Sequence, residues 1–221
     1  MTTHLVSLLH LCDSLFPLGA FAHSDGLEAA TASGRVATAA DLASWLEATL
    51  AQPLRHLDGP AIARAWQAQR EGHVDVLRAI DDEVHALRSS STGREASRAM
   101  GARLISTWVR LHPAVRADLA HLVPLTLPVA FGVVSASAGI GQEESVQGYL
   151  YTRLAATVSA AMRLISLGQH AGHQLLADTL ATVPATARAI VDDDRSLMSF
   201  APLLDLEGMR QQYVHSRLFR S

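Results

Sequence analysis

Two of the eleven histidines have a spacing that metal ligands often show. His170 and His173 are three residues apart, so both side chains would face the same way from a helix, as paired ligands do. No carboxylate follows at a helical spacing to complete a ligand set, and Gly168 and Gly172 weaken the helix. The pattern favours a structural or surface role for the pair and leaves a metal-binding role open.

The run His23-Ser24-Asp25 contains the three residue types of a hydrolase triad. Adjacent residues cannot form the sequential hydrogen bonds that a triad needs, and no Gly-x-Ser-x-Gly nucleophile elbow surrounds Ser24. The acidic runs at 81–83 and 192–194 are typical of solvated helix ends. We therefore predict no catalytic residue and no metal site.

Lysine and cysteine usage excludes several other chemistries. All 18 basic residues are arginine, so the lysine of a phosphate-binding loop and the amine of a Schiff-base enzyme are both missing. Cys12 is the single cysteine, which excludes an intramolecular disulfide and a cysteine-rich metal cluster. The chain is therefore predicted to be neither an enzyme nor the carrier of a cofactor.

A short break between helices, Phe16 to Phe21, combines a proline, a glycine and two aromatic residues. Pro17 has a fixed φ, and Gly19 can adopt φ values that other residues avoid. The phenylalanine side chains would anchor a tight turn. The same composition would also suit an exposed docking loop. The residue types favour packing, with the docking role kept as the alternative.

The elements that must position these residues are helices. Alanine and leucine dominate the composition, and apolar residues recur at helical spacing along the chain. Four apolar stripes are clear: Leu42, Trp45, Leu46 and Leu50; Val74, Leu77, Ile80, Val84 and Leu87; Met100, Leu104, Trp108 and Leu111; Leu150, Leu154, Val158, Met162 and Ile165. No segment alternates as a strand does. We predict an all-α fold, a single compact bundle of about ten helices with a C-terminal tail.

Helix starts are indicated by local capping patterns. Thr38 with Asp41 and Thr92 with Glu95 are spaced as capping boxes. Asp58 precedes Gly59-Pro60, which suits a cap followed by a proline in the first turn. These patterns divide the chain into short-looped helices, as expected for a bundle.

The segment from Leu119 to Gln142 carries no Asp, Glu or Arg and is long enough to span a bilayer. Pro124 and Pro128 interrupt it and no basic or aromatic anchors flank it, so a buried core helix is favoured. The net charge of −3 and the lack of a basic stripe argue against nucleic acid as a partner. We predict no membrane and no nucleic-acid contact.

The C-terminal residues differ from the rest of the chain. We divide it into a helical domain, residues 1–208, and a tail, residues 209–221. The tail ends in Arg217-Leu218-Phe219-Arg220, an apolar pair between two arginines, which is typical of an exposed interface anchor. A tail folded back on its own bundle is the alternative.

Several stretches together resemble the UreF family of urease accessory proteins. The run from Phe16 to Glu28 is similar to the family's N-terminal signature, a Pro-x-Gly-x-aromatic loop followed by Ser-x-Gly-Leu-Glu. The segments 94–101, 127–132, 149–151 and 167–169 follow in the family's order, and the terminus resembles its tail. The resemblance covers almost the whole chain.

The resemblance implies a cytoplasmic, usually homodimeric scaffold in urease maturation. Such a protein joins a UreD/UreH-type accessory protein and the GTPase UreG, and the assembly inserts nickel into apo-urease. The partner-binding residues carried over are those of the signature and the tail: Pro17, Gly19, Phe21, Ser24, Gly26, Tyr213, Arg217, Leu218, Phe219 and Arg220. This chain has Gln211-Gln212 where the family commonly has His-Glu.

Two other functions remain open at this point. The protein could regulate the partner GTPase by supplying an arginine in trans, which is worth roughly 10³ to 10⁵ in rate. It could instead bind nickel itself through histidines. The docking scaffold is the leading hypothesis.

Overall fold

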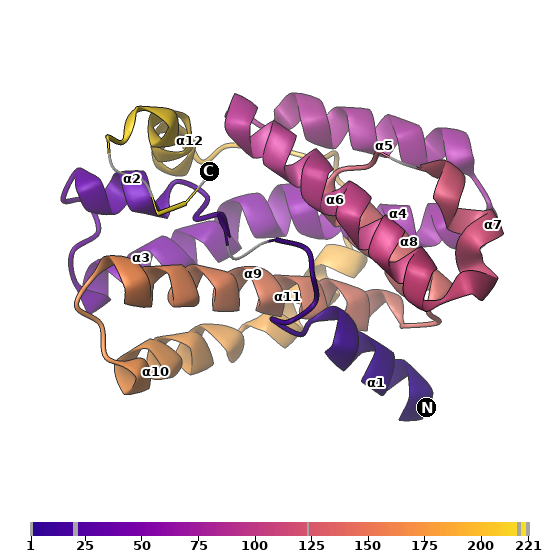
Figure 1. Cartoon of the computed structure of the whole chain (residues 1–221), viewed down its shortest axis with the longest axis horizontal. Coiled ribbons are helices and arrows are strands. Elements are labelled where there is room, and N and C mark those ends of the chain that lie inside the picture. The colour runs from indigo at the N-terminus through magenta and orange to yellow at the C-terminus, as the bar shows by residue number, and fades with distance from the viewer. Residues whose placement is uncertain (1, 20–21, 123, 216–217, 220–221) are drawn as a thin grey trace.

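The computed structural model describes residues 2–19, 22–122, 124–215 and 218–219, and within these ranges every regular element is helical. The elements are α1 (Thr2–Leu11), α2 (Leu27–Ala32), α3 (Ala39–Thr49), η2 (Leu50–Asp58), α4 (Gly59–Glu71), α5 (Val74–Leu87), α6 (Ser91–Leu111), η3 (Pro113–Val115), α7 (Arg116–Leu119), η4 (Ala120–Leu122), α8 (Leu127–Ser137), α9 (Gln142–Leu164), α10 (Gln169–Leu180), α11 (Val183–Val191), α12 (Pro202–Arg210) and η5 (Gln211–Tyr213). The predicted all-α bundle is confirmed (Figure 1).

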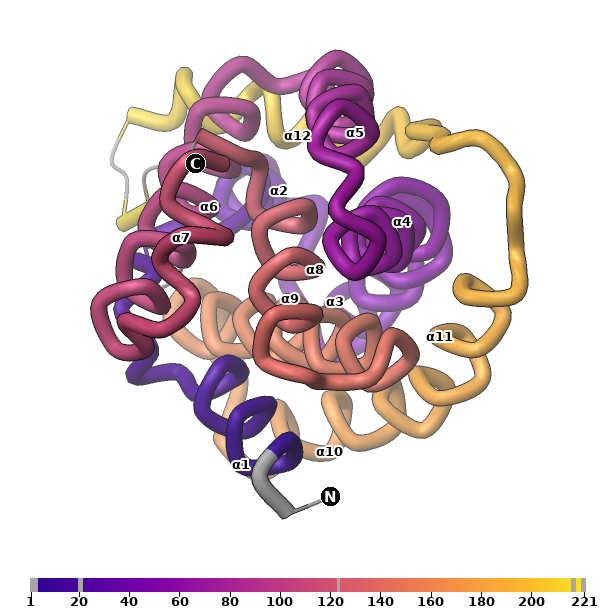
Figure 2. Tube along the Cα trace, turned by 90° about the vertical axis from the view of Figure 1, so that its right-hand side faces the viewer, coloured from indigo at the N-terminus to yellow at the C-terminus, as the bar shows by residue number. Residues whose placement is uncertain are grey.

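Helix α8 is the centre of the bundle. Every residue from Leu127 to Ala136 is buried, and the surrounding helices, among them α4, α6 and α9, enclose it (Figure 2). Gly132 allows α4 to approach closely, since a Cβ there would lie 2.5 Å from the Ile62 carbonyl oxygen of α4. The prediction that the uncharged stretch forms a buried core helix is thus confirmed for α8. No helix in the described ranges is long and apolar enough to span a membrane.

Helices α3 and α4 are joined without a loop by the π-helical segment η2. Pro53 lies inside this segment, where it has no N–H to donate and its ring crowds the preceding turn. The wider π turn accommodates the proline, and the Gly59 N–H donates to the Leu54 carbonyl five residues back. The arrangement turns Leu54, Leu57 and Asp58 inward.

The capping predictions have mixed outcomes. Thr38 and Asp41 form the expected capping box at the start of α3. Helix α6 begins at Ser91 instead, with the Ser90 hydroxyl accepting from the Gly93 N–H, so the box at Thr92 is wrong. Consecutive serines offer several caps, and local pattern does not choose between them.

The cap predicted at Asp58 is also wrong. Asp58 lies in a continuous helix and makes no side-chain cap. Its carboxylate instead accepts from Arg88 at 2.5 Å and from the Tyr149 hydroxyl at 2.9 Å.

Candidate partner-docking site

Helix α2, where the N-terminal signature ends, contacts the C-terminal part of the chain. Helix α12 packs against α2, and Leu218 and Phe219 lie beside it (Figure 1). The Glu28 carboxylate of α2 accepts from the Leu218 N–H at 2.5 Å, the Phe219 N–H at 3.2 Å and the Gln211 side-chain amide at 2.6 Å. The N-terminal signature and the C-terminal tail therefore form one surface.

Gly26 makes the close contact between α2 and α12 possible. It has a φ of 84°, and a Cβ there would lie 2.6 Å from the Gly208 backbone nitrogen. Ser24, two residues earlier, is buried, and its hydroxyl oxygen accepts a hydrogen bond from the Glu28 N–H at 3.4 Å. These two signature residues thus shape the backbone beneath the surface.

The substitution Gly26→Ala should destabilise the protein by about 2–5 kcal/mol, since it adds left-handed strain and a backbone clash with α12. Gly34→Ala is the matched control: Gly34 also has a positive φ, 74°, but its Cβ would meet nothing within 4 Å. Urea denaturation of both variants measures the difference. Equal losses would show that the approach of α12 contributes nothing.

The loop before the signature's serine is partly packed. Phe16 is buried and its ring centroid lies 6.4 Å from that of Trp108, while Pro17 is exposed. Gly19 has a φ of 77°, and the neighbouring Leu18 carbonyl accepts from Arg103 of α6 at 3.0 Å. Phe21 lies outside the described residues, so its predicted role stays a prediction.

The tail lies against the bundle rather than away from it. Phe219 is 3% exposed, and the Arg163 guanidinium sits 4.1 Å from its ring centroid. The expectation of an exposed Phe219 is therefore wrong, because Glu28 and Arg163 hold its backbone and ring. Leu218 and Tyr213, in contrast, are 65% and 80% exposed. Arg217 and Arg220 lie outside the described residues.

Sequence reasoning missed two residues that hold this arrangement, Glu28 and Gln211. Gln211 is buried, and its side-chain oxygen accepts from the Ala29 N–H at 3.1 Å while its amide donates to Glu28. Gln211 is one of the two tail positions at which the sequence departs from the pattern of the family it resembles, and Glu28 is the charged residue of the signature's Gly-Leu-Glu. Those two facts were the signals available in the sequence.

An exposed apolar stripe runs along α12 and its flanks. Its members are Phe200, Leu203, Leu206, Met209 and Tyr213, which we call the C-terminal stripe. Within α12 the spacing of three residues places Leu203, Leu206 and Met209 near one face. Exposed apolar patches of this kind mark protein interaction sites.

Comparison with known proteins decides the family. The family model for UreF matches residues 36–180. A urease accessory protein UreF from Cupriavidus taiwanensis is 34% identical over 98% of this chain and 97% of its own length. Another from Lachnoclostridium phytofermentans is 31% identical over the full length of both. The chain belongs to the UreF family.

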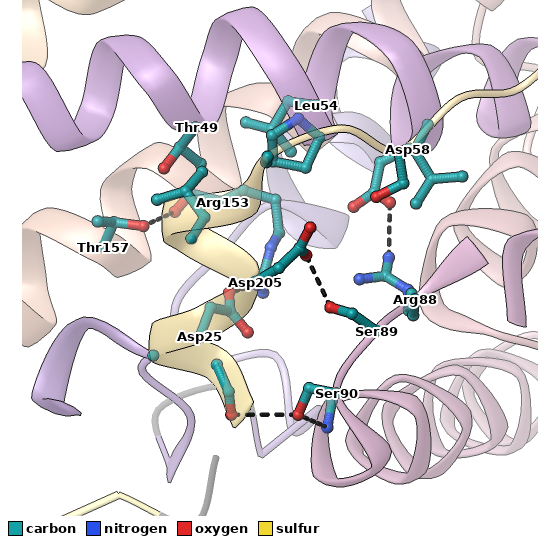
Figure 3. Close-up of a pocket in the computed structure, with 18 of the residues that line it drawn as sticks. Asp25, Thr49, Leu54, Asp58, Arg88, Ser89, Ser90, Arg153, Thr157 and Asp205 are labelled. Atoms are coloured by element: carbon teal, nitrogen blue, oxygen red, sulfur yellow. Dashed lines mark hydrogen bonds and ion pairs between the residues drawn. The ribbon is translucent and has the colours of Figure 1, made fainter. Parts of the chain in front are cut away.

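In this UreF-family chain a cavity of about 130 Å³ lies beneath α12 (Figure 3). Helices α9 and α3, the η2 segment and the turn before α6 complete its wall. Arg153 of α9 pairs with Asp25 at its edge, and Ser89 donates to Asp205 of α12 at 2.7 Å. Burial lowers the pKa of Arg153 to about 10, so the guanidinium remains charged at neutral pH.

A polar cluster in the wall of this cavity connects η2, α9 and the residue that follows α5. Asp58 of η2 accepts from both Arg88, which follows α5, and Tyr149 of α9. Burial and the neighbouring Asp58 carboxylate raise the pKa of Tyr149 well above its ordinary value, so the phenol donates. The cluster connects helices of this UreF-family chain through side-chain hydrogen bonds.

The residues considered for metal or nucleophilic chemistry lie apart. His170 and His173 are exposed on α10, and no group of three His, Cys, Asp or Glu side chains within the described residues is placed to hold a metal ion. Ser24 accepts from Glu28, and Asp25 pairs with Arg153. Burial raises the pKa of the Cys12 thiol to about 12, which keeps it protonated at neutral pH.

Proposed function

We propose that this chain is a scaffold in urease maturation: it docks a UreD/UreH-type accessory protein and brings a UreG-type GTPase to apo-urease for nickel insertion. The C-terminal stripe carries the proposal, because it presents several large apolar side chains to solvent beside a tail fixed at Glu28. Membership of a family of urease accessory proteins supplies the class of partner. A cytoplasmic homodimer is part of the same proposal, on the resemblance alone.

Co-purification tests the scaffold function. The tagged chain, co-expressed with its own organism's UreD/UreH-type protein and UreG-type GTPase, should capture both, and the complex should raise the nickel content of apo-urease. Failure to capture the UreD/UreH-type protein would end the proposal. Tyr213→Ser on the C-terminal stripe should weaken capture, whereas the control Val76→Ser, at an exposed position of α5, should not.

GTP turnover separates recruitment from regulation. A scaffold leaves the partner's turnover rate unchanged within the complex, whereas a regulator that supplies an arginine would raise it by orders of magnitude. We expect recruitment. A large increase that depends on one arginine of this chain would establish the regulator instead.

The double substitution His170→Ala with His173→Ala should leave urease activation nearly unchanged. Both side chains are exposed on α10, and two histidines do not complete a ligand set. Nickel content and activity of the reconstituted urease are the measurements, with helicity of the variant as the folding control. A large loss of activation in a folded variant would favour the nickel-binding hypothesis.

A further inference from the structure

Glu28 is a buried carboxylate surrounded by donors from the other end of the chain. The residue is 4% exposed. One carboxylate oxygen accepts from the Leu218 N–H, and the other accepts from the Phe219 N–H and from Gln211. Hydrogen bonds to an ionised acceptor are stronger than neutral ones, and two of these fix the backbone whatever the side chains are.

Other contacts of the tail converge on the same place. Gln211 bridges Glu28 and the Ala29 N–H, so it holds the start of the tail on α2. The Phe219 ring lies under Arg163 of α9, on the side of the tail that faces the bundle. Between these points, Tyr213 and Leu218 face solvent. Gln211 and Phe219 therefore hold the tail on the bundle, whereas Tyr213 and Leu218 are available to a partner.

We propose that Glu28 is a positioning residue for partner docking: its carboxylate holds the C-terminal tail on α2, so that the partner meets an ordered surface instead of a loose segment. The inference rests on the proposed scaffold function and adds the residue that controls the docking surface. Ordering a segment in advance raises affinity, because the apparent dissociation constant is the intrinsic one divided by the fraction in the competent state.

The first test is Glu28→Gln. The carboxamide keeps the size of the side chain but offers one acceptor oxygen and adds an N–H₂ group among three donors. Backbone hydrogen exchange in the free protein should speed up about tenfold or more at Leu218 and Phe219, and the dissociation constant for the UreD/UreH-type protein should rise about tenfold. The double variant Glu28→Gln with Gln211→Glu returns a carboxylate to the cluster and should recover part of both losses.

The second test removes a donor and leaves α2 untouched. Leu218→Pro loses the N–H that Glu28 accepts, whereas Leu218→Ala keeps it and loses only the exposed side chain. The proline variant should free the tail and bind the partner more weakly than the alanine variant. This pair remains informative even if Glu28→Gln fails to fold.

The outcomes distinguish a failure of the positioning role of Glu28 from a failure of the scaffold function. Exchange at wild-type rates in Glu28→Gln and Leu218→Pro, or a freed tail with unchanged affinity, would overturn the role of Glu28 while the scaffold stands. If the wild-type chain captures no UreD/UreH-type protein, the scaffold function and the docking role both fail.

Discussion

Removal of residues 214–221 is expected to abolish capture of the UreD/UreH-type protein and to leave the helical bundle folded. The deletion takes away Leu218 and the ring of Phe219, which lies under Arg163 of α9, while α8 itself stays buried by α4, α6 and α9. Loss of the exposed Leu218 side chain together with the backbone that is held on Glu28 should weaken binding more than about a hundredfold.

The same deletion should lower stability only modestly. Exposing the pocket of one phenylalanine costs about 1.5–3 kcal/mol, and Glu28 regains water when its backbone donors leave. Thermal unfolding by circular dichroism and binding calorimetry measure the two effects, with Val76→Ala, at an exposed position of α5, as a control for surface change. Full-strength capture by the shortened chain would contradict the docking role; a chain that unfolds would show that the tail is structural.

Asp58→Ala is expected to destabilise the bundle strongly. It leaves the Arg88 guanidinium without its carboxylate and the Tyr149 hydroxyl without its acceptor, in a buried site between η2 and α9. Breaking one half of a buried pair costs about 3–5 kcal/mol. For a chain of this size that lowers the melting temperature by roughly 10 °C.

Two controls define the origin of that loss. Tyr149→Phe removes the hydroxyl alone and should cost about 1 kcal/mol. Asp193→Ala removes an aspartate that pairs with Arg195 at the surface and should change stability little. If Asp58→Ala were no worse than Asp193→Ala, the buried cluster would not be a cross-link.

Helix positions were predictable because apolar residues at helical spacing can be recognised in the sequence alone. Leu42, Trp45 and Leu46 are buried on α3 as their spacing required, and the uncharged stretch became the central helix α8. Such patterns depend only on neighbours within two turns. The fold class could therefore be read before any contact was known.

Buried carboxylates were not predictable for the opposite reason. Asp58 looked like a helix cap and Asp81 like part of a solvated run, yet Asp81 accepts from the Thr126 N–H at 2.6 Å and is 4% exposed. Their partners lie 30 and 45 residues away, where local pattern carries no information. Phe219 was misplaced for the same reason, since its partners on α2 and α9 are far from the terminus in sequence.

The distance between Glu28 and its donors has a consequence for how the protein is made. The hydrogen bond from the Leu218 N–H to Glu28 joins residues that are 190 positions apart in the sequence. Chains fold from the N-terminus as they leave the ribosome. The bundle can therefore form before the Leu218 and Phe219 N–H groups are available to Glu28. The surface on α2 is completed only after Leu218 and Phe219 have been synthesised. Chains that stop before Leu218 would thus fold without competing for the partner.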